Sequence, residues 1–84
     1  MEAKQWAVDV YITESGDDTH VRTLLTTTAE AGKIEGAGHA RRNPRDRQVP
    51  EIGDELAVGR ALIDLGSRLV RLAGLDIEES ATRR

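Results

Sequence analysis

Residues 40–57 read ARRNPRDRQVPEIGDELA, and this stretch joins the end of a predicted strand to the start of a predicted helix. In its first half, four arginines and one aspartate give a local charge of +3. The second half reverses the sign through three carboxylates, Glu51, Asp54 and Glu55. Because Pro44 and Pro50 limit the backbone of this segment, the pattern predicts a loop of defined shape over residues 42–50.

Before this stretch, apolar side chains recur at every second residue, which is the period of a β-strand with one buried face. The first such run carries Trp6, Val8, Val10 and Ile12. Two further runs, at about residues 19–27 and 33–41, follow turn-forming segments at 15–18 and 29–32. Short turns favour an antiparallel meander with the second strand in the centre. We therefore expect a three-stranded sheet over about residues 4–41.

After this stretch, apolar residues recur at helical spacing. Pro50 suits the first turn of a helix and Gly74 suits its end, so we expect a helix over about residues 51–73 and a polar, frayed tail over 74–84. About 21 helical residues span ~32 Å, and strands of ~9 residues span about 30 Å. The predicted fold class is therefore α+β, a three-stranded antiparallel β-meander with one long C-terminal helix packed on one face.

Small residues favour close packing of these two layers. The third strand's inner face has no side chain at Gly36 and Gly38, and the helix carries a stripe with seven-residue spacing, Gly59, Gly66 and Ala73. Glycine within a helix costs ~1 kcal/mol against alanine, which a close helix–sheet approach would offset; alternatively, some of these glycines are merely tolerated. The residues expected to be most buried are Trp6, Val8, Val10, Val21, Leu25, Ile34, Leu62 and Leu69.

The composition bounds the function classes. Eighty-four residues make one small domain, and the absence of cysteine excludes disulfides, thiolate metal ligands and a cysteine nucleophile. A net charge of −3 argues against general attraction to nucleic acid or anionic lipid. The N-terminal residues lack the apolar run of a signal peptide, and no segment is apolar enough to span a bilayer. We expect a cytoplasmic protein without membrane contact.

The β-β-β-α order, with Trp6 opening the first strand, resembles a small uncharacterised, mainly actinobacterial family. Its fold is like that of the double-stranded-RNA-binding domain without the first helix. The resemblance covers nearly the full chain and is strongest at residues 36–46 (GxGxARxNPxD) and 49–57 (VPEIGDELA), continuing to residues 60–62. It implies the fold; because the family has no established activity, it supplies no catalytic residues.

Four arginines of the loop are candidate contacts for phosphate or for a partner, namely Arg41, Arg42, Arg45 and Arg47. Domains that bind duplex RNA touch phosphates with a basic cluster at the start of their last helix. The adjacent carboxylates, the negative net charge and the missing first helix disfavour this function here. Alternatively, the arginines pair with those carboxylates and shape the loop. We keep nucleic-acid binding as an alternative and expect contacts within the protein to order the loop.

The two histidines are the next candidates. If residues of the second hairpin pair so that their numbers sum to 59, His20 faces His39 on the open side of the sheet. Two imidazoles could begin a metal site with a carboxylate such as Asp9 or Glu35. Surface histidines without a ligand are the more common case, so we assign no metal site, and equally no cofactor site.

Catalysis has little support, because the chain shows no nucleophile motif and no phosphate-binding glycine loop. We assign no catalytic residues and rank self-association first, as a dimer or higher homo-oligomer. The apolar arc of the helix covers roughly 200°, whereas packing on one sheet needs little more than ~100°. The flank expected to remain uncovered consists of Val58, Leu65, Leu69 and Leu72. Alternatively, strong sheet twist or the tail covers this flank within one chain.

Overall fold

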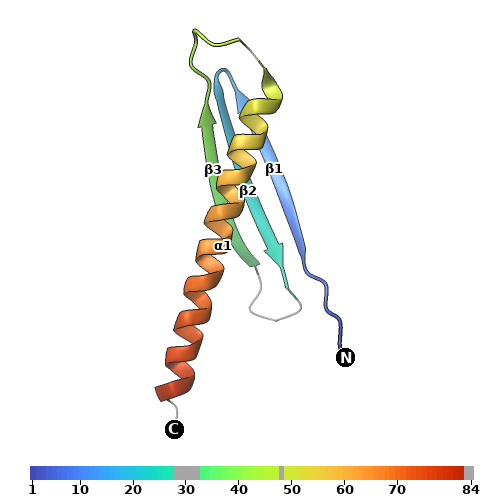
Figure 1. Cartoon of the computed structure of the whole chain (residues 1–84), viewed down its shortest axis with the longest axis vertical. Helices are drawn as coiled ribbons and strands as arrows, with labels where there is room; N and C mark the ends of the chain where they lie inside the picture. The colour runs from blue at the N-terminus through green and yellow to red at the C-terminus, as the bar shows by residue number, and fades with distance from the viewer. Residues whose placement is uncertain (28–32, 48, 83–84) are drawn as a thin grey trace.

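The computed structural model describes residues 1–27, 33–47 and 49–82. Three antiparallel strands in the order β1-β2-β3 are followed by one helix (Figure 1). Their bounds are β1 Ala7–Ser15, β2 Asp18–Thr26, β3 Lys33–Arg41 and α1 Pro50–Thr82. The predicted fold class is confirmed. The first turn lies at Gly16, whose φ of 60° is in the left-handed region that glycine adopts without strain. The second predicted turn, at 29–32, lies outside the described residues.

The helix is longer than predicted. It has 33 residues and continues through Gly74, so the tail expected over residues 74–84 is helical to Thr82. The prediction failed because a single glycine costs only ~1 kcal/mol in a helix, and no proline follows it. Gly74 also lacks the positive φ of a helix-ending glycine, a conformation that only Gly16 adopts among the described glycines. No helix in the described part of the chain is apolar enough over the length needed to cross a membrane.

The core lies between α1 and only two of the strands. Its buried apolar residues come from β2, β3 and α1: Val21, Leu25, Ala40, Ala57, Ala61 and Leu65. A Cβ added to Gly36 would lie 2.5 Å from the Ala61 carbonyl oxygen, and one added to Gly38 would overlap that of Ala57. The glycines of β3 therefore admit the helix backbone itself, as the close-packing prediction required.

A buried hydroxyl also links the two layers. Thr23, in the middle of β2, is fully buried. Its Oγ1 lies 3.3 Å from the carbonyl oxygen of Gly36 and 3.4 Å from that of Ala61. Because a hydroxyl has one proton, it donates to one of these carbonyls at a time. A polar group thus stays satisfied where strand and helix come closest.

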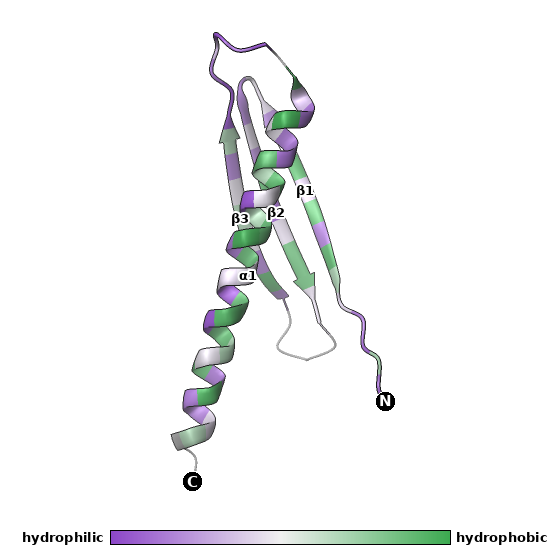
Figure 2. Ribbon diagram, in the orientation of Figure 1, coloured by the Kyte–Doolittle hydropathy of each residue, from purple (hydrophilic) through white to green (hydrophobic). Residues whose placement is uncertain are grey.

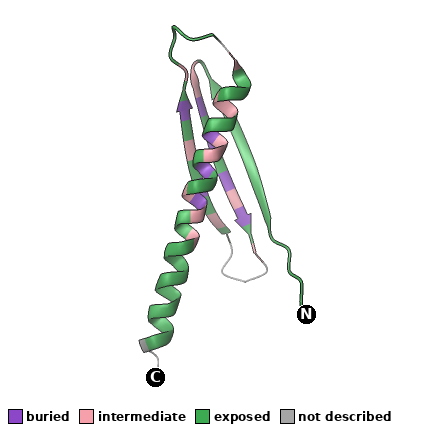
Figure 3. Cartoon of the chain, viewed as in Figure 1, coloured by how far each residue is buried: buried purple, intermediate pink, exposed green. Residues whose placement is uncertain are grey.

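Half of the predicted core is wrong, because α1 covers β2 and β3 and leaves β1 open (Figure 3). Val21 and Leu25 are buried, whereas Ile34 and Leu69 are half-buried. The remaining four are exposed: Trp6, Val8, Val10 and Leu62. The reason lies in the small residues at the contact. Close approach makes the helix layer narrow, and a narrow layer covers two strands rather than three.

Gly59 and Gly66 of α1 do not take part in the contact between the helix and the sheet. A Cβ added to Gly59 or Gly66 would meet nothing within 4 Å. The sheet instead receives Ala57, Ala61 and Leu65, which are spaced by four residues and so lie on one side of the helix. The prediction that the Gly59, Gly66 and Ala73 stripe packs on the sheet is therefore wrong for both glycines.

Candidate functional site: an uncovered apolar surface and two polar clusters

One face of β1 is apolar and uncovered. Ile12, Val10 and Val8 pair with Val21, Thr23 and Leu25 of β2, so they lie on the helix side of the sheet. Together with Trp6 they are 41–52% exposed. Figure 2 shows this apolar strand beside α1 over most of its length, with the helix crossing only its upper end. An exposed row of this kind is unusual for a monomer and is typical of an interaction site.

The helix carries a second apolar row, on the side away from the sheet. Its members are spaced by seven residues, which returns them to nearly the same side of a helix: Leu56, Ile63, Val70 and Ile77. Their exposed fractions run from 46% to 75%. Three residues after the first two of these come Gly59 and Gly66, with open space around them. The row is thus bordered by small residues, which would let another helix approach closely.

The C-terminal part of α1 extends past the sheet (Figure 1). Thirty-three residues span about 50 Å, against about 30 Å for strands of nine residues. Residues 70–81 are all exposed, and they include Leu72, Leu75 and Ile77. Isolated helical segments of this length are marginal in water, because most helical stability comes from packing an apolar face. This segment therefore presents apolar side chains without covering from its own sheet.

These surfaces differ from the flank predicted to be uncovered. Leu65 is only 3% exposed, Val58 packs against the core cluster and Leu69 is half-buried, so only Leu72 of the four is exposed. The expectation of an open flank is therefore wrong for Leu65. The signal that could have located the open side is the row of large apolar residues at seven-residue spacing.

Side chains of α1 close the free edge of β3. The Ala37 backbone N–H donates to Asp64 Oδ2 at 2.8 Å, and Arg60 Nη1 donates to the His39 carbonyl oxygen at 2.8 Å. Asp64 also accepts from Arg68 Nε at 3.1 Å. The hydrogen bond from Ala37, followed by that from Arg68, lowers the pKa of Asp64. These contacts occupy backbone groups that an edge strand would otherwise offer to another strand.

The arginine loop is organised by one of its four arginines. Arg42 Nη2 contacts Asp17 Oδ1 at 2.5 Å, and Arg42 Nη1 donates to the Asp46 carbonyl oxygen at 2.7 Å. The Arg42 backbone N–H also donates to the Asp17 carbonyl oxygen, at 2.8 Å. The carboxylate partner is therefore in the β1–β2 turn and not among the helix carboxylates that the sequence suggested. Contacts within the protein shape this part of the loop.

The other three loop arginines, Arg41, Arg45 and Arg47, are exposed. With Asp17, Asp46 and the first turns of α1, the loop encloses a pocket of about 470 Å³. Glu14 also lines this pocket, and hydrogen bonding to Asp54 together with repulsion from its charge raises the pKa of Glu14. Three carboxylates of its lining offset the charge of its three arginines, so the pocket has no net positive charge to attract phosphate.

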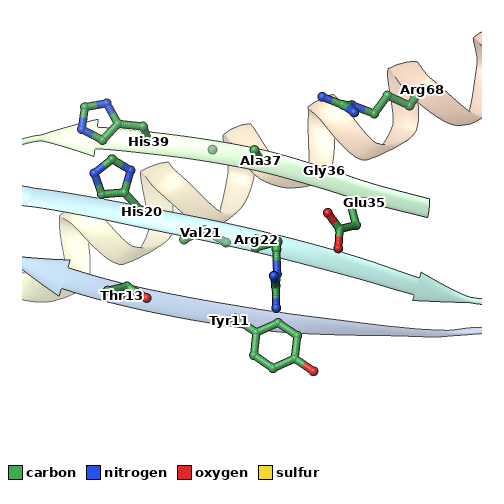
Figure 4. A pocket seen from close by; sticks show the side chains of 11 residues that line it. Tyr11, Thr13, His20, Val21, Arg22, Glu35, Gly36, Ala37, His39 and Arg68 are labelled. Atoms are coloured by element: carbon green, nitrogen blue, oxygen red, sulfur yellow. The ribbon is translucent and has the colours of Figure 1, made fainter. Parts of the chain in front are cut away.

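On the opposite face of the sheet, the two histidines meet as the register argument predicted. Residue numbers in the second hairpin sum to 59, so His20 pairs with His39. Figure 4 shows the two rings side by side, and their centroids are 4.5 Å apart with a 22° angle between the planes. The carboxylate beside them is not Asp9 or Glu35. It is Asp18, whose Oδ1 lies 2.8 Å from His39 Nε2.

The fold and these surfaces define a small α+β domain of β-β-β-α order. The Rv2632c-like family model matches residues 4–84, so the chain belongs to the Rv2632c-like family. Uncharacterized protein Mb1767 of Mycobacterium bovis is 45% identical over 75 residues, which cover 89% of this chain and 78% of that protein. Uncharacterized protein Rv2632c of Mycobacterium tuberculosis is 40% identical over 77 residues, covering 92% and 81% respectively.

A solved structure shares the fold over the whole chain. The crystal structure of Rv2632c aligns with a TM-score of 0.89 and 37% sequence identity, covering 100% of this chain and 98% of that one. The predicted relationship to a small, uncharacterised, mainly actinobacterial family is therefore confirmed by these mycobacterial relatives. The likeness to the double-stranded-RNA-binding domain stays a prediction. These relatives carry no described activity, so the function has to be argued from the surfaces above.

Proposed function

We propose that the protein is a non-catalytic interaction module that associates with a second copy of itself. The observation that carries this proposal is the surface area. The chain exposes 6940 Å², whereas a compact monomer of 9.2 kDa exposes only about 4,900 Å². The excess, about 2,000 Å², is more than twice the ~800 Å² that each partner buries in a standard interface. A cytoplasmic location stays a prediction from the composition.

The shape of the uncovered surface favours a second copy as the occupant. Each chain has a strand, β1, without a helix over it, and a helix, α1, that extends beyond its sheet. In a two-fold pairing the same two surfaces meet twice, so the α1 of each copy covers the β1 of the other. One symmetric contact then buries both apolar rows, which no contact among the described residues of one chain achieves.

The test uses two adjacent residues of β1 that point to opposite faces of the sheet. Val10 lies in the proposed interface, and Tyr11 lies on the open face beside Arg22, whose guanidinium carbon is 5.1 Å from the Tyr11 ring centroid. Val10→Glu and Tyr11→Glu add the same charge at similarly exposed positions of one strand. We expect sedimentation equilibrium to give twice the 9.2 kDa chain mass for the wild type and Tyr11→Glu, and the single-chain mass for Val10→Glu.

A wild-type chain that stays monomeric at high micromolar concentration overturns the proposal. So does a Val10→Glu variant that associates as well as the wild type. Ile63→Glu is a second variant, on the other apolar row, and its exposed position makes a folding defect easy to exclude by circular dichroism. Loss of association in both glutamate variants, with retained helicity, supports the two-surface contact.

Nucleic-acid binding through the arginine loop is the competing function. Arg42 is occupied by Asp17 and Asp46, which leaves three exposed arginines next to the carboxylates of the pocket. We therefore expect no binding of short duplex RNA at micromolar protein in ~150 mM salt. Binding that is lost in an Arg45→Ala, Arg47→Ala double variant would reverse the ranking of the two functions.

A further inference from the structure

The open face of the sheet brings together three side chains that are all metal ligands in other proteins. His20 and His39 face each other across the β2–β3 pairing, and Asp18 precedes His20 by two residues, on the same face of β2. One donor atom from each of the three residues can be chosen so that all lie within 4.8 Å of one another. From this geometry we propose that Asp18, His20 and His39 bind a divalent transition-metal ion, such as Zn²⁺.

One pair of the three donor atoms is already close enough for a shared ion, and the third side chain has to move. Zinc bonds of about 2.0–2.1 Å in a tetrahedral arrangement place the ligand atoms ~3.4 Å from one another. Asp18 Oδ1 and His39 Nε2, at 2.8 Å, are already closer than that, so the ion would replace the proton that they share. His20 would have to bring its donor atom closer by up to ~1.4 Å and turn its ring, because a bound ion lies in the plane of each imidazole, whereas the two rings are now stacked with their planes 22° apart.

The ligand set fits zinc and its neighbours better than calcium or magnesium. Two imidazoles with one carboxylate suit Zn²⁺, Cu²⁺ or Ni²⁺, whereas Ca²⁺ and Mg²⁺ prefer oxygen ligands alone. Three protein ligands leave a fourth position for water. The side chains of His39 and Asp18 are 48% and 35% exposed, so an ion can reach them from solvent. Both histidines also line a shallow hollow of about 780 Å³ on this face (Figure 4).

The surrounding charges set the strength of the site. The hydrogen bond with His39, followed by the charge of Arg41, lowers the pKa of Asp18. Arg41 pairs with Asp18 across the strands, and Arg22 lies two residues beyond His20 on the same face. Two cations nearby weaken the attraction for a third. We therefore expect micromolar binding, weaker than that of a closed structural zinc site.

The site is independent of the proposed self-association. Its three residues lie on the face of the sheet opposite to α1 and to the apolar row of β1. Metal binding can therefore be measured in the monomeric Val10→Glu variant as well as in the wild type. The two proposals fail separately.

The experiment is a titration of the full chain with ZnCl₂ by calorimetry, with Co²⁺ as a spectroscopic probe. We expect one ion per chain and visible Co²⁺ bands of the intensity typical of tetrahedral coordination. His20→Ala, His39→Ala and Asp18→Asn should each weaken binding by more than ~10-fold. Asp9→Asn, which removes an exposed carboxylate from the same face outside the cluster, should leave binding unchanged.

Absence of binding at millimolar Zn²⁺ overturns the proposal. Binding that persists in the His20→Ala, His39→Ala double variant also overturns it, because the ion would then sit elsewhere on the chain. Circular dichroism of each variant checks that the sheet is intact, which the exposed positions of both histidines favour.

Discussion

The two edge strands of this sheet have the same length, but the helix covers one of them and leaves the other exposed. β3 and β1 both have nine residues and both pair with β2. β3 lies against the helix, has glycines at Gly36 and Gly38, and has its free edge bonded by Asp64 and Arg60. β1 has larger apolar residues on its inner face and is exposed along its whole length. The difference shows that the smallest side chains decide where the helix packs.

Larger side chains on β1 would bury more area if the helix moved onto them. At ~25 cal/mol per Å² of apolar surface, this burial would stabilise the fold. The close contact at β3 competes with it through dispersion between backbone and backbone, and through the hydrogen bonds that Asp64 and Arg60 make to the strand edge. The apolar row of β1 is then available to another chain.

The largest effect on stability is expected from adding a side chain at the close contact between β3 and α1. Gly38→Ala places a Cβ against the Ala57 carbonyl oxygen and the Ala61 nitrogen, and both of these are backbone atoms that cannot move aside without shifting the helix. We expect a loss of ~3 kcal/mol or more in the free energy of unfolding, measured by urea denaturation. A fully folded variant of wild-type stability would show that helix and strand are not held as closely as described.

The same glycine-to-alanine change on the side of α1 away from the sheet should raise stability instead of lowering it. Gly66→Ala adds the same methyl group where nothing lies within 4 Å, and alanine favours the helix by ~1 kcal/mol over glycine. The variant should be made in the Val10→Glu background, so that association does not contribute to the urea midpoint. Destabilisation there would mean that the far side of α1 is already packed within one chain.

The hydrogen bond between Asp64 and the edge of β3 should make the stability of the fold depend on pH in the acidic range. The folded state lowers the pKa of Asp64, so its carboxylate stabilises the fold above the ordinary carboxyl pKa. That contribution is lost as the pH falls through the folded pKa. Asp64→Asn keeps an acceptor for the Ala37 N–H but carries no charge. We expect its melting temperature to fall less than that of the wild type on acidification, and equal slopes would contradict the role of the charge.

The smallest effect is expected at the end of β1. The pKa of Glu14 is raised by Asp54, so the folded state binds the Glu14 proton more tightly than the unfolded state does. The stabilisation is present at low pH and is lost as the pH rises through the folded pKa. Glu14→Gln removes the repulsion, and we expect a slightly higher melting temperature at neutral pH and no difference in acid. Thermal melts at both pH values check the sign.

Much of the strand layer could be predicted from the residues. The alternation of apolar and polar side chains placed β3 at its observed bounds and β2 within one residue of them. Short turns then favoured antiparallel pairing of neighbouring strands. The strand bounds and the pairing direction depend on residues close in sequence, which is why pattern alone was sufficient for them. The register that brings His20 opposite His39 was only one possibility, and the structure supplies it.

The chain by itself determined the strands, the start of the helix and the residues facing each side of the sheet, because each follows from local period and turn chemistry. It did not determine which side of α1 meets the sheet, since the helix carries two stripes of small residues, Ala57 with Ala61 and Gly59 with Gly66. Only the tertiary structure selects the first. Alanine gives a helix the same narrow contact as glycine without the conformational entropy of glycine, so the alanine side enters the core and the glycine side stays outside it. That selection leaves β1 uncovered.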